Sequence, residues 1–324
     1  MGFVQKSAEV DDLTTDFDRL IQHCRELIAR LGKRTRIEST KLGHYRREMK
    51  KLSGLSATEA AKLLGVVRKY CAINAVFDAP NQFKITDEQL FELVKGSSTV
   101  DDENERYNDK FFEVALAARL AVAMGKTALI DLSTACDLIC DDFAIECKYV
   151  HSVSSLRELF GKGMDQLQAR FDASLAKEGL VALDVSNVLD KQRIEAFFQY
   201  TFDLFRENYG HIAAGDGSFA EHFKKEGIST CITNDRNFVG IVRNFISHEM
   251  ETVVCGTLSQ GDVDKLDDKR LGIFFQSTQY FCVEYDKGRL PILCRGATYR
   301  TSPVLSDKAK EKLVKQIHSW AVGF

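Results

Sequence analysis

The chain has 324 residues, of which 44% are hydrophobic and 28% are charged, a composition that predicts a folded protein with a sizeable core and excludes a disordered chain. The net charge of −3 excludes nucleic-acid binding through a generally basic surface, so any such binding must use a local patch. The sequence contains no membrane-span pattern and no secretory-signal pattern, and its nine cysteines follow no metal or disulfide spacing, so we expect a cytoplasmic protein with reduced thiols and no membrane partner.

Residues 11–95 carry helical patterns. Apolar residues from Phe17 to Leu31 recur every three or four positions and are followed by Gly32, which is typical of the end of an amphipathic helix. A second helix is predicted after Ser56, because Ser56 and Glu59 have the spacing of a capping box. We therefore predict a helical domain over residues 1–98.

Residues 33–51, between these two helices, are rich in Lys and Arg. Arg46, Arg47, Lys50 and Lys51 form either a solvated helix face or a surface that contacts phosphate groups. Taken alone, the segment favours the solvated face. A nucleic-acid function elsewhere in the chain would favour the second interpretation.

The polar and acidic residues 97–109 mark a domain boundary, and we assign residues 99–324 to a second domain. Its predicted elements are an apolar helix ending at Gly125, strands within 127–133, 135–140 and 142–150, a helix at 155–176, a strand at 179–186, helices at about 191–207 and 236–249, and strands at 251–259 and 270–285. This order predicts an α/β, or α+β, fold in which helices flank a mixed sheet.

Acidic residues interrupt the strand pattern at 136–150, although strands are normally depleted in Asp and Glu. Asp141 and Asp142 can form a two-residue turn, which would pair residues 140 with 143, 139 with 144, 138 with 145, and 137 with 146. Asp137 would then lie opposite Glu146, and alternation along the strand would place Lys148 on the same face. We expect the opposite, apolar face to enter the core.

Two facing carboxylates repel each other, so this arrangement predicts a cation between them. Mg²⁺ is commonly bound by one or two carboxylates together with waters and phosphate oxygens. Lys148 beside the carboxylates could hold or deprotonate an attacking water, or stabilise charge on a phosphate. The set therefore predicts a metal-dependent site for phosphodiester cleavage.

Asp137, followed on the next strand by Glu146-Cys147-Lys148, resembles the PD-(D/E)XK signature of the restriction-endonuclease-like nucleases, with Cys136 in the place of the proline. The resemblance covers about residues 105–190 and implies a restriction-endonuclease-like core there, followed by C-terminal helices and strands at 191–324. It implies that Mg²⁺ or Mn²⁺ is the cofactor and that Lys148 orients the nucleophile. The metal ligands it implies are Asp137, Glu146, the Cys147 backbone carbonyl and, as a further acid, Glu113. Lys162 and Gln166 are similar to a Lys and a Gln that members of the family place one turn apart near the site.

The resemblance implies a nuclease for which DNA is favoured over RNA, with roles in restriction, phage defence, recombination or repair. A defence effector that works with a partner protein is favoured, because the chain has no helicase or methylase motif. Two alternatives stay open: a non-catalytic nucleic-acid-binding or assembly subunit with a nuclease-like fold, and an RNA-directed nuclease. Glu48-Met49-Lys50 also has the Glu-X-Lys spacing, but it lies in the basic helical segment with no acid on a preceding strand.

Overall fold

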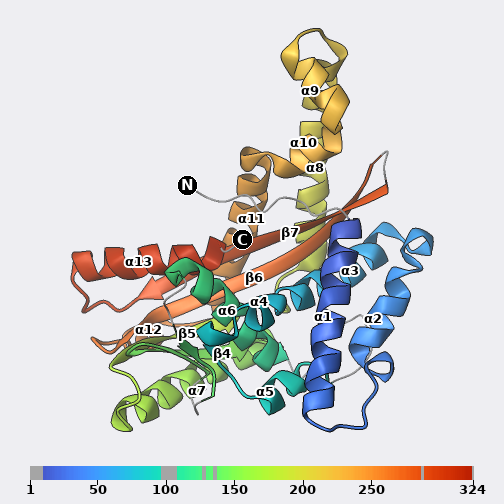
Figure 1. The fold of residues 1–324 in the computed structure, drawn as a ribbon. Coiled ribbons are helices and arrows are strands. Elements are labelled where there is room, and N and C mark those ends of the chain that lie inside the picture. Colours follow the sequence, from blue (N-terminus) through green and yellow to red (C-terminus); the bar gives the residue numbers. More distant parts are fainter. Residues whose placement is uncertain (1–9, 96–107, 126–128, 134–136, 286–287, 323–324) are drawn as a thin grey trace.

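The computed structural model describes residues 10–95, 108–125, 129–133, 137–285 and 288–322, which form one mixed sheet with helices on both faces (Figure 1). The α-helices are α1 (Val10–Arg30), α2 (Lys41–Met49), α3 (Ala57–Cys71), α4 (Asn74–Asp78), α5 (Asp87–Glu92), α6 (Asn108–Met124), α7 (Val153–Asp172), α8 (Lys191–Ala214), α9 (Ser218–Glu226), α10 (Ile228–Asn234), α11 (Arg236–Thr257), α12 (Gln260–Val263) and α13 (Asp307–Val322). The predicted α/β character is therefore confirmed.

The seven strands lie side by side in chain order. They are β1 (Phe83–Lys84), β2 (Ile130–Asp131), β3 (Leu138–Cys140), β4 (Phe143–Tyr149), β5 (Glu178–Asp184), β6 (Arg270–Tyr285) and β7 (Gly288–Thr301). β4, β5 and β6 are parallel neighbours, whereas β3 with β4 and β6 with β7 are antiparallel. Parallel neighbours need crossover connections, and α7 provides the one between β4 and β5.

The predicted hairpin of β3 and β4 forms with the expected turn. Cys140 pairs with Phe143, and the described pairing ends where Leu138 meets Ile145. Asp137 immediately precedes β3 in the chain and is not part of the strand, so the expected strand pair between residues 137 and 146 is not formed.

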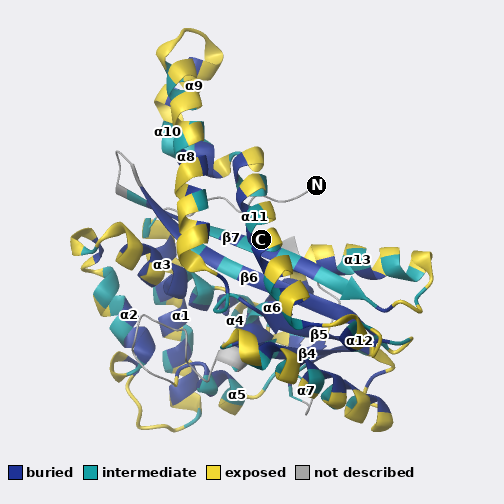
Figure 2. Ribbon diagram, turned by 180° about the vertical axis from the view of Figure 1, so that it is seen from behind, coloured by how far each residue is buried: buried dark blue, intermediate teal, exposed yellow. Residues whose placement is uncertain are grey.

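Helices cover both faces of the sheet, so the apolar face of the hairpin enters a core as expected and the opposite face is covered as well. Ile145 and Cys147 belong to a first core, which β4 shares with α1, α3, α6 and α13. Ala144 belongs to a second core, shared with α7, α8 and α11. Glu146 is 0% exposed as a result, and Figure 2 shows the strands mostly buried between helices whose outer faces are exposed.

The N-terminal helices form as predicted, and they pack against the sheet. α3 begins with the expected capping box, in which the Glu59 N–H donates to Ser56 Oγ (3.3 Å) and the Ser56 N–H donates to Glu59 Oε2 (2.9 Å). Gly65 of α3 lies so close to β6 that a Cβ there would be 2.3 Å from Cγ of Tyr280. Helices on both sides of the predicted domain boundary share the first core, whereas residues 97–107 of that boundary lie outside the described residues.

Beyond β5, the predicted helices and the predicted strand at 270–285 are present, but the predicted strand at 251–259 is wrong. α11 continues through Thr257, because Ile246, Met250 and Val254 maintain a helical spacing towards the second core. Part of α8 and the helices α9 and α10 rise from the sheet as an arm (Figure 1). The sequence patterns did not predict β1, β7 or α13. None of the described helices combines the length and the hydropathy needed to cross a membrane.

The turn between β3 and β4 gives a first prediction. Asp141 has a φ of 53°, in the left-handed region that disfavours residues with a Cβ, whereas Asp142 has no positive φ. We expect Asp141→Gly to raise the free energy of unfolding by about 0.5–1 kcal/mol, as measured by urea denaturation. Asp142→Gly is the matched control and should lower it, because glycine adds freedom to the unfolded chain there and removes the ion pair of Asp142 with Lys177. Equal effects of the two changes would contradict this view of the turn.

Candidate functional site

Asp137 immediately precedes β3 and provides the next hydrogen-bond acceptor for β4. Its Oδ2 accepts from the Cys147 backbone N–H at 2.7 Å. This amide lies two residues beyond the last described pair of β3 and β4, so the carboxylate replaces a missing strand partner. Asp137 is therefore fixed beside the C-terminal half of β4.

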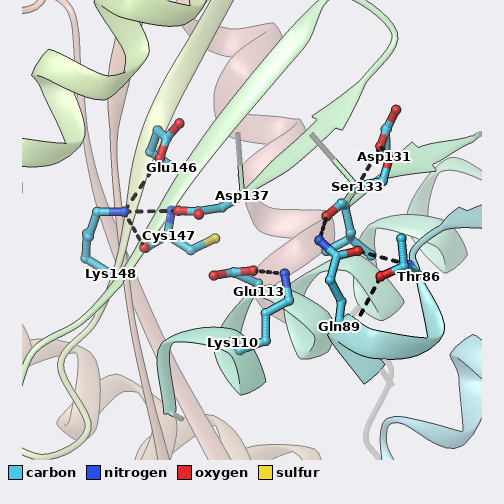
Figure 3. A network of polar contacts seen from close by, with 11 residues as sticks. Thr86, Gln89, Lys110, Glu113, Asp131, Ser133, Asp137, Glu146, Cys147 and Lys148 are labelled. Carbon is cyan, nitrogen blue, oxygen red and sulfur yellow. Dashed lines mark hydrogen bonds and ion pairs between the residues drawn. The ribbon is translucent and has the colours of Figure 1, made fainter. Parts of the chain in front are cut away.

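The ammonium of Lys148 lies where three oxygens converge (Figure 3). Its Nζ is 3.0 Å from Asp137 Oδ2, 2.8 Å from the Cys147 carbonyl oxygen and 3.5 Å from Glu146 Oε2. Burial by itself lowers the pKa of Lys148, but the charge and hydrogen bond of Asp137, together with Glu146, raise it above its ordinary value. Lys148 is therefore a cation at neutral pH. The ammonium of Lys148 thus lies between the two carboxylates, at the position for which the sequence predicted a divalent metal ion.

Glu146 is held by a second cation, from α7. Arg170 Nε lies 3.3 Å from Glu146 Oε1, so the two carboxylate oxygens face Arg170 and Lys148 respectively. α7 approaches the sheet closely because Gly163 has no side chain: a Cβ there would be 2.8 Å from Val181. The close packing brings Arg170 to Glu146. The buried carboxylate is tolerated because a buried charge needs a partner of opposite sign, and Arg170 is one.

Glu113 of α6 approaches the same group, the position that the resemblance to the nuclease family implied for it. Lys110, one turn earlier on the helix, lies 2.5 Å from Glu113 Oε2. Burial first, and the charge of Asp137 second, raise the pKa of Glu113 to about 7, against the opposing effects of Lys110 and Lys148. Glu113 can therefore exchange a proton near neutral pH, which is a property of general acids and bases.

The other two predicted residues of α7 lie differently. Lys162 is exposed and pairs with Glu158 at 2.6 Å, so the structure does not bring it into the group around Lys148. Gln166 is half-buried, and its Oε1 has no hydrogen-bond partner among the described residues. Sequence reasoning missed Arg170, although it follows Gln166 by one helical turn and therefore lies on the same face of α7.

The four basic residues proposed as a nucleic-acid surface are mostly engaged within the protein. Arg46 pairs with Asp18 at 2.8 Å, Arg47 donates to the Glu38 carbonyl at 2.7 Å, and Lys51 pairs with Glu48 at 2.8 Å. Lys50 is exposed. These contacts leave the segment with less free positive charge than its sequence suggested.

The oxygens around Lys148 fit a hard divalent cation. Within the described part of the chain, no three side chains of Asp, Glu, His or Cys cluster closely enough to hold a metal by themselves. Mg²⁺, however, usually binds one or two carboxylates and keeps several waters. Asp137, Glu146 and the Cys147 carbonyl supply such oxygens, and they already surround one positive charge. A metal ion would have to replace the ammonium of Lys148 at this point.

The raised pKa of Glu113 predicts a pH dependence of stability. The folded-state value of about 7 exceeds the ordinary value of 4.5, so the folded protein holds this proton more tightly than the unfolded chain. Stability from this group is fully present below about pH 4.5 and is lost as the pH rises through about 7. In EDTA, Glu113→Gln should remove a loss of up to about 3 kcal/mol between pH 5 and pH 8, measured by denaturant unfolding. Glu158→Gln, at an exposed carboxyl with a lowered pKa, should leave the slope unchanged. A wild-type slope equal to that of Glu113→Gln would contradict the assignment.

Removal of the Lys148 ammonium should expose the repulsion that it balances. In EDTA, Lys148→Met should lower the free energy of unfolding by roughly 3 kcal/mol, because two mainly buried carboxylates lose a shared partner. Lys84→Met is the control. It removes an exposed partner of Asp131 and should cost less than about 1 kcal/mol.

Mg²⁺ should then raise the melting temperature of Lys148→Met more than that of the wild type, because no ammonium has to be displaced. If Lys148→Met unfolds like the wild type in EDTA, the ammonium does not hold the carboxylates together.

Comparison of the chain with models of protein families, with curated proteins and with solved structures gave no match. Its function has to be argued from the site itself.

Proposed function

We propose that the chain is a metal-dependent nuclease with a restriction-endonuclease-like core, hydrolysing phosphodiester bonds with Mg²⁺ or Mn²⁺. The observation that carries the proposal is the convergence of Asp137, Glu146 and the Cys147 carbonyl on one cation, the ammonium of Lys148. A cluster that binds a lysine in this way supplies the oxygen ligands that a hard cation needs. When bound, the metal would neutralise charge on a phosphate and lower the pKa of a water.

Each residue of the site has its own role in the proposed reaction. Asp137 and Glu146 would hold the cation, with Glu146 kept in orientation by Arg170. Displaced from its resting place, the Lys148 ammonium would remain beside the carboxylates and could hold the attacking water or a phosphate oxygen. Glu113, with a pKa of about 7, is placed to accept or return a proton or to assist the cation.

DNA is the proposed substrate, and an RNA-directed nuclease would use the same residues. The alternative of a non-catalytic subunit interprets the charge cluster as purely structural. Buried ion pairs are, however, often less stabilising than apolar residues of similar volume. Two carboxylates that share one lysine, with Glu113 nearby, are therefore a costly way to build a core and a useful way to bind a metal.

The decisive experiment incubates the purified protein with plasmid DNA, single-stranded DNA and RNA in Mg²⁺, Mn²⁺ or EDTA. We expect cleavage with metal and none in EDTA. Asp137→Asn, Glu146→Gln and Lys148→Met should each reduce the rate by at least about a hundredfold, because each removes charge stabilisation at the reacting phosphate. Thermal melts of the variants verify that they are folded.

The second Glu-X-Lys sequence provides the matched control. Glu48→Gln and Lys50→Met change the same residue types at the same spacing, but on α2 and just beyond its end, and should leave cleavage intact. Full activity of a folded Glu146→Gln protein would refute the nuclease assignment, and metal-independent binding without cleavage would favour the non-catalytic subunit.

A further inference from the structure

Arginines gather above one face of β6, away from the cluster around Lys148. Gln276, Thr278 and Tyr280 are every second residue of this strand and face the side of the first core. Each is therefore about 7 Å from the next along the strand. Arg119 of α6 donates from Nη2 to Gln276 Oε1. Arg295 of β7, which pairs with Thr278 across the strands, donates from Nε to Thr278 Oγ1 at 3.3 Å.

Two further arginines join from other helices. Arg68 of α3 follows Gly65, which packs on the Tyr280 ring, by three residues and thus lies on the same side of its helix. Arg243 of α11 reaches the edge of the sheet and donates from Nε to the Arg295 carbonyl at 3.2 Å. Burial lowers the pKa of Arg295, the charges of Tyr280 and Asp184 oppose this, and Arg243 and Arg68 lower it further.

A carboxylate is linked to this group through the side-chain amide of Gln276. Asp184 of β5 is the carboxylate of this network, and its oxygens accept from neutral donors: Oδ1 from Ser186 and Oδ2 from Gln276 Nε2 at 2.7 Å. The Gln276 amide therefore stands between Asp184 and Arg119. Arg119 is only 6% exposed, and its Nε has no hydrogen-bond partner among the described residues. A buried guanidinium with an unused donor is costly unless something else neutralises it.

We infer that Arg119, Arg295 and Arg68 bind a phosphate group. The guanidinium is planar and presents paired donors that match phosphate oxygens, and it recognises them better than an ammonium does. Arg68 and Arg295 are half-buried, while Arg119 forms the buried end of the group. The inference does not depend on the proposed cleavage, because none of these arginines belongs to the cluster around Lys148.

The position of the arginine group relates it to that cluster. Arg119 and Glu113 are both on α6, less than two turns apart. α6 thus contributes Glu113 to the region rich in carboxylates and Arg119 to the region rich in guanidinium groups.

The test is titration of the full chain with pyrophosphate in EDTA, at constant ionic strength set with chloride, followed by calorimetry and thermal unfolding. We expect saturable binding and a higher melting temperature for the wild type. Arg119→Gln and Arg295→Gln should each weaken binding by at least about tenfold, the value of one charge-assisted hydrogen bond. Arg193→Gln, at an exposed arginine paired with Glu249, is the matched control and should leave binding unchanged.

Without ligand, Arg119→Gln should melt at or above the wild-type temperature, because it removes an unsatisfied buried charge. If this variant does not fold, Arg295→Gln carries the test, since Arg295 is half-buried. Absence of pyrophosphate binding by the wild type, or undiminished binding by a folded Arg295→Gln protein, would overturn the inference.

A parallel titration with a short single-stranded oligonucleotide identifies the source of the phosphate. Binding of both probes that depends on Arg295 indicates a nucleic-acid backbone, whereas binding of pyrophosphate alone indicates a small phosphorylated molecule. Asp137→Asn should bind pyrophosphate like the wild type. The result therefore stands even if no nuclease activity is found, and nuclease activity can be found even if this site fails.

Discussion

The contacts of the Lys148 ammonium with Asp137, Glu146 and the Cys147 carbonyl are the constraint on which the rest of the site depends. Buried charges are tolerated only when neighbours of opposite sign balance them. Here the signs alternate outward from Lys148, through Glu146 to Arg170. The sheet, α6 and α7 must therefore be packed correctly before any one of these groups is stable in its place.

The architecture of the hairpin brings Asp137 next to Lys148. Among the described residues, the pairing of β3 with β4 ends at Ile145, and the Asp137 carboxylate takes the place of a backbone carbonyl for the Cys147 N–H. On its other side, β4 stays paired with β5 along its whole length, which keeps Glu146 and Lys148 in a rigid frame. A strand segment that is held rigidly on one side gives side chains the orientation that chemistry at a polar ligand requires.

The electrostatics of the two regions on the sheet are complementary. One gathers carboxylates around a cation, and the other gathers guanidinium groups with one carboxylate that is already satisfied by neutral donors. A polyanion such as a nucleic acid could use both, the first through a metal ion and the second directly. The engagement of Arg46, Arg47 and Lys51 in contacts within the N-terminal helices makes the arginines above β6 a stronger candidate for phosphate recognition than the basic segment 33–51.

The sequence by itself determined the local features: the amphipathic α1, the capping box of α3, the turn at Asp141 and the neighbourhood of Glu146 and Lys148. These follow from periodicity and turn length, which act over a few residues. Only the tertiary structure decided the burial of Glu146, the approach of Arg170 and the arginine group above β6, because those contacts join segments far apart in the chain across crossover connections. The apolar run at 251–257 shows the same division: its composition suits a strand or a helix, and packing of α11 on the second core selected the helix.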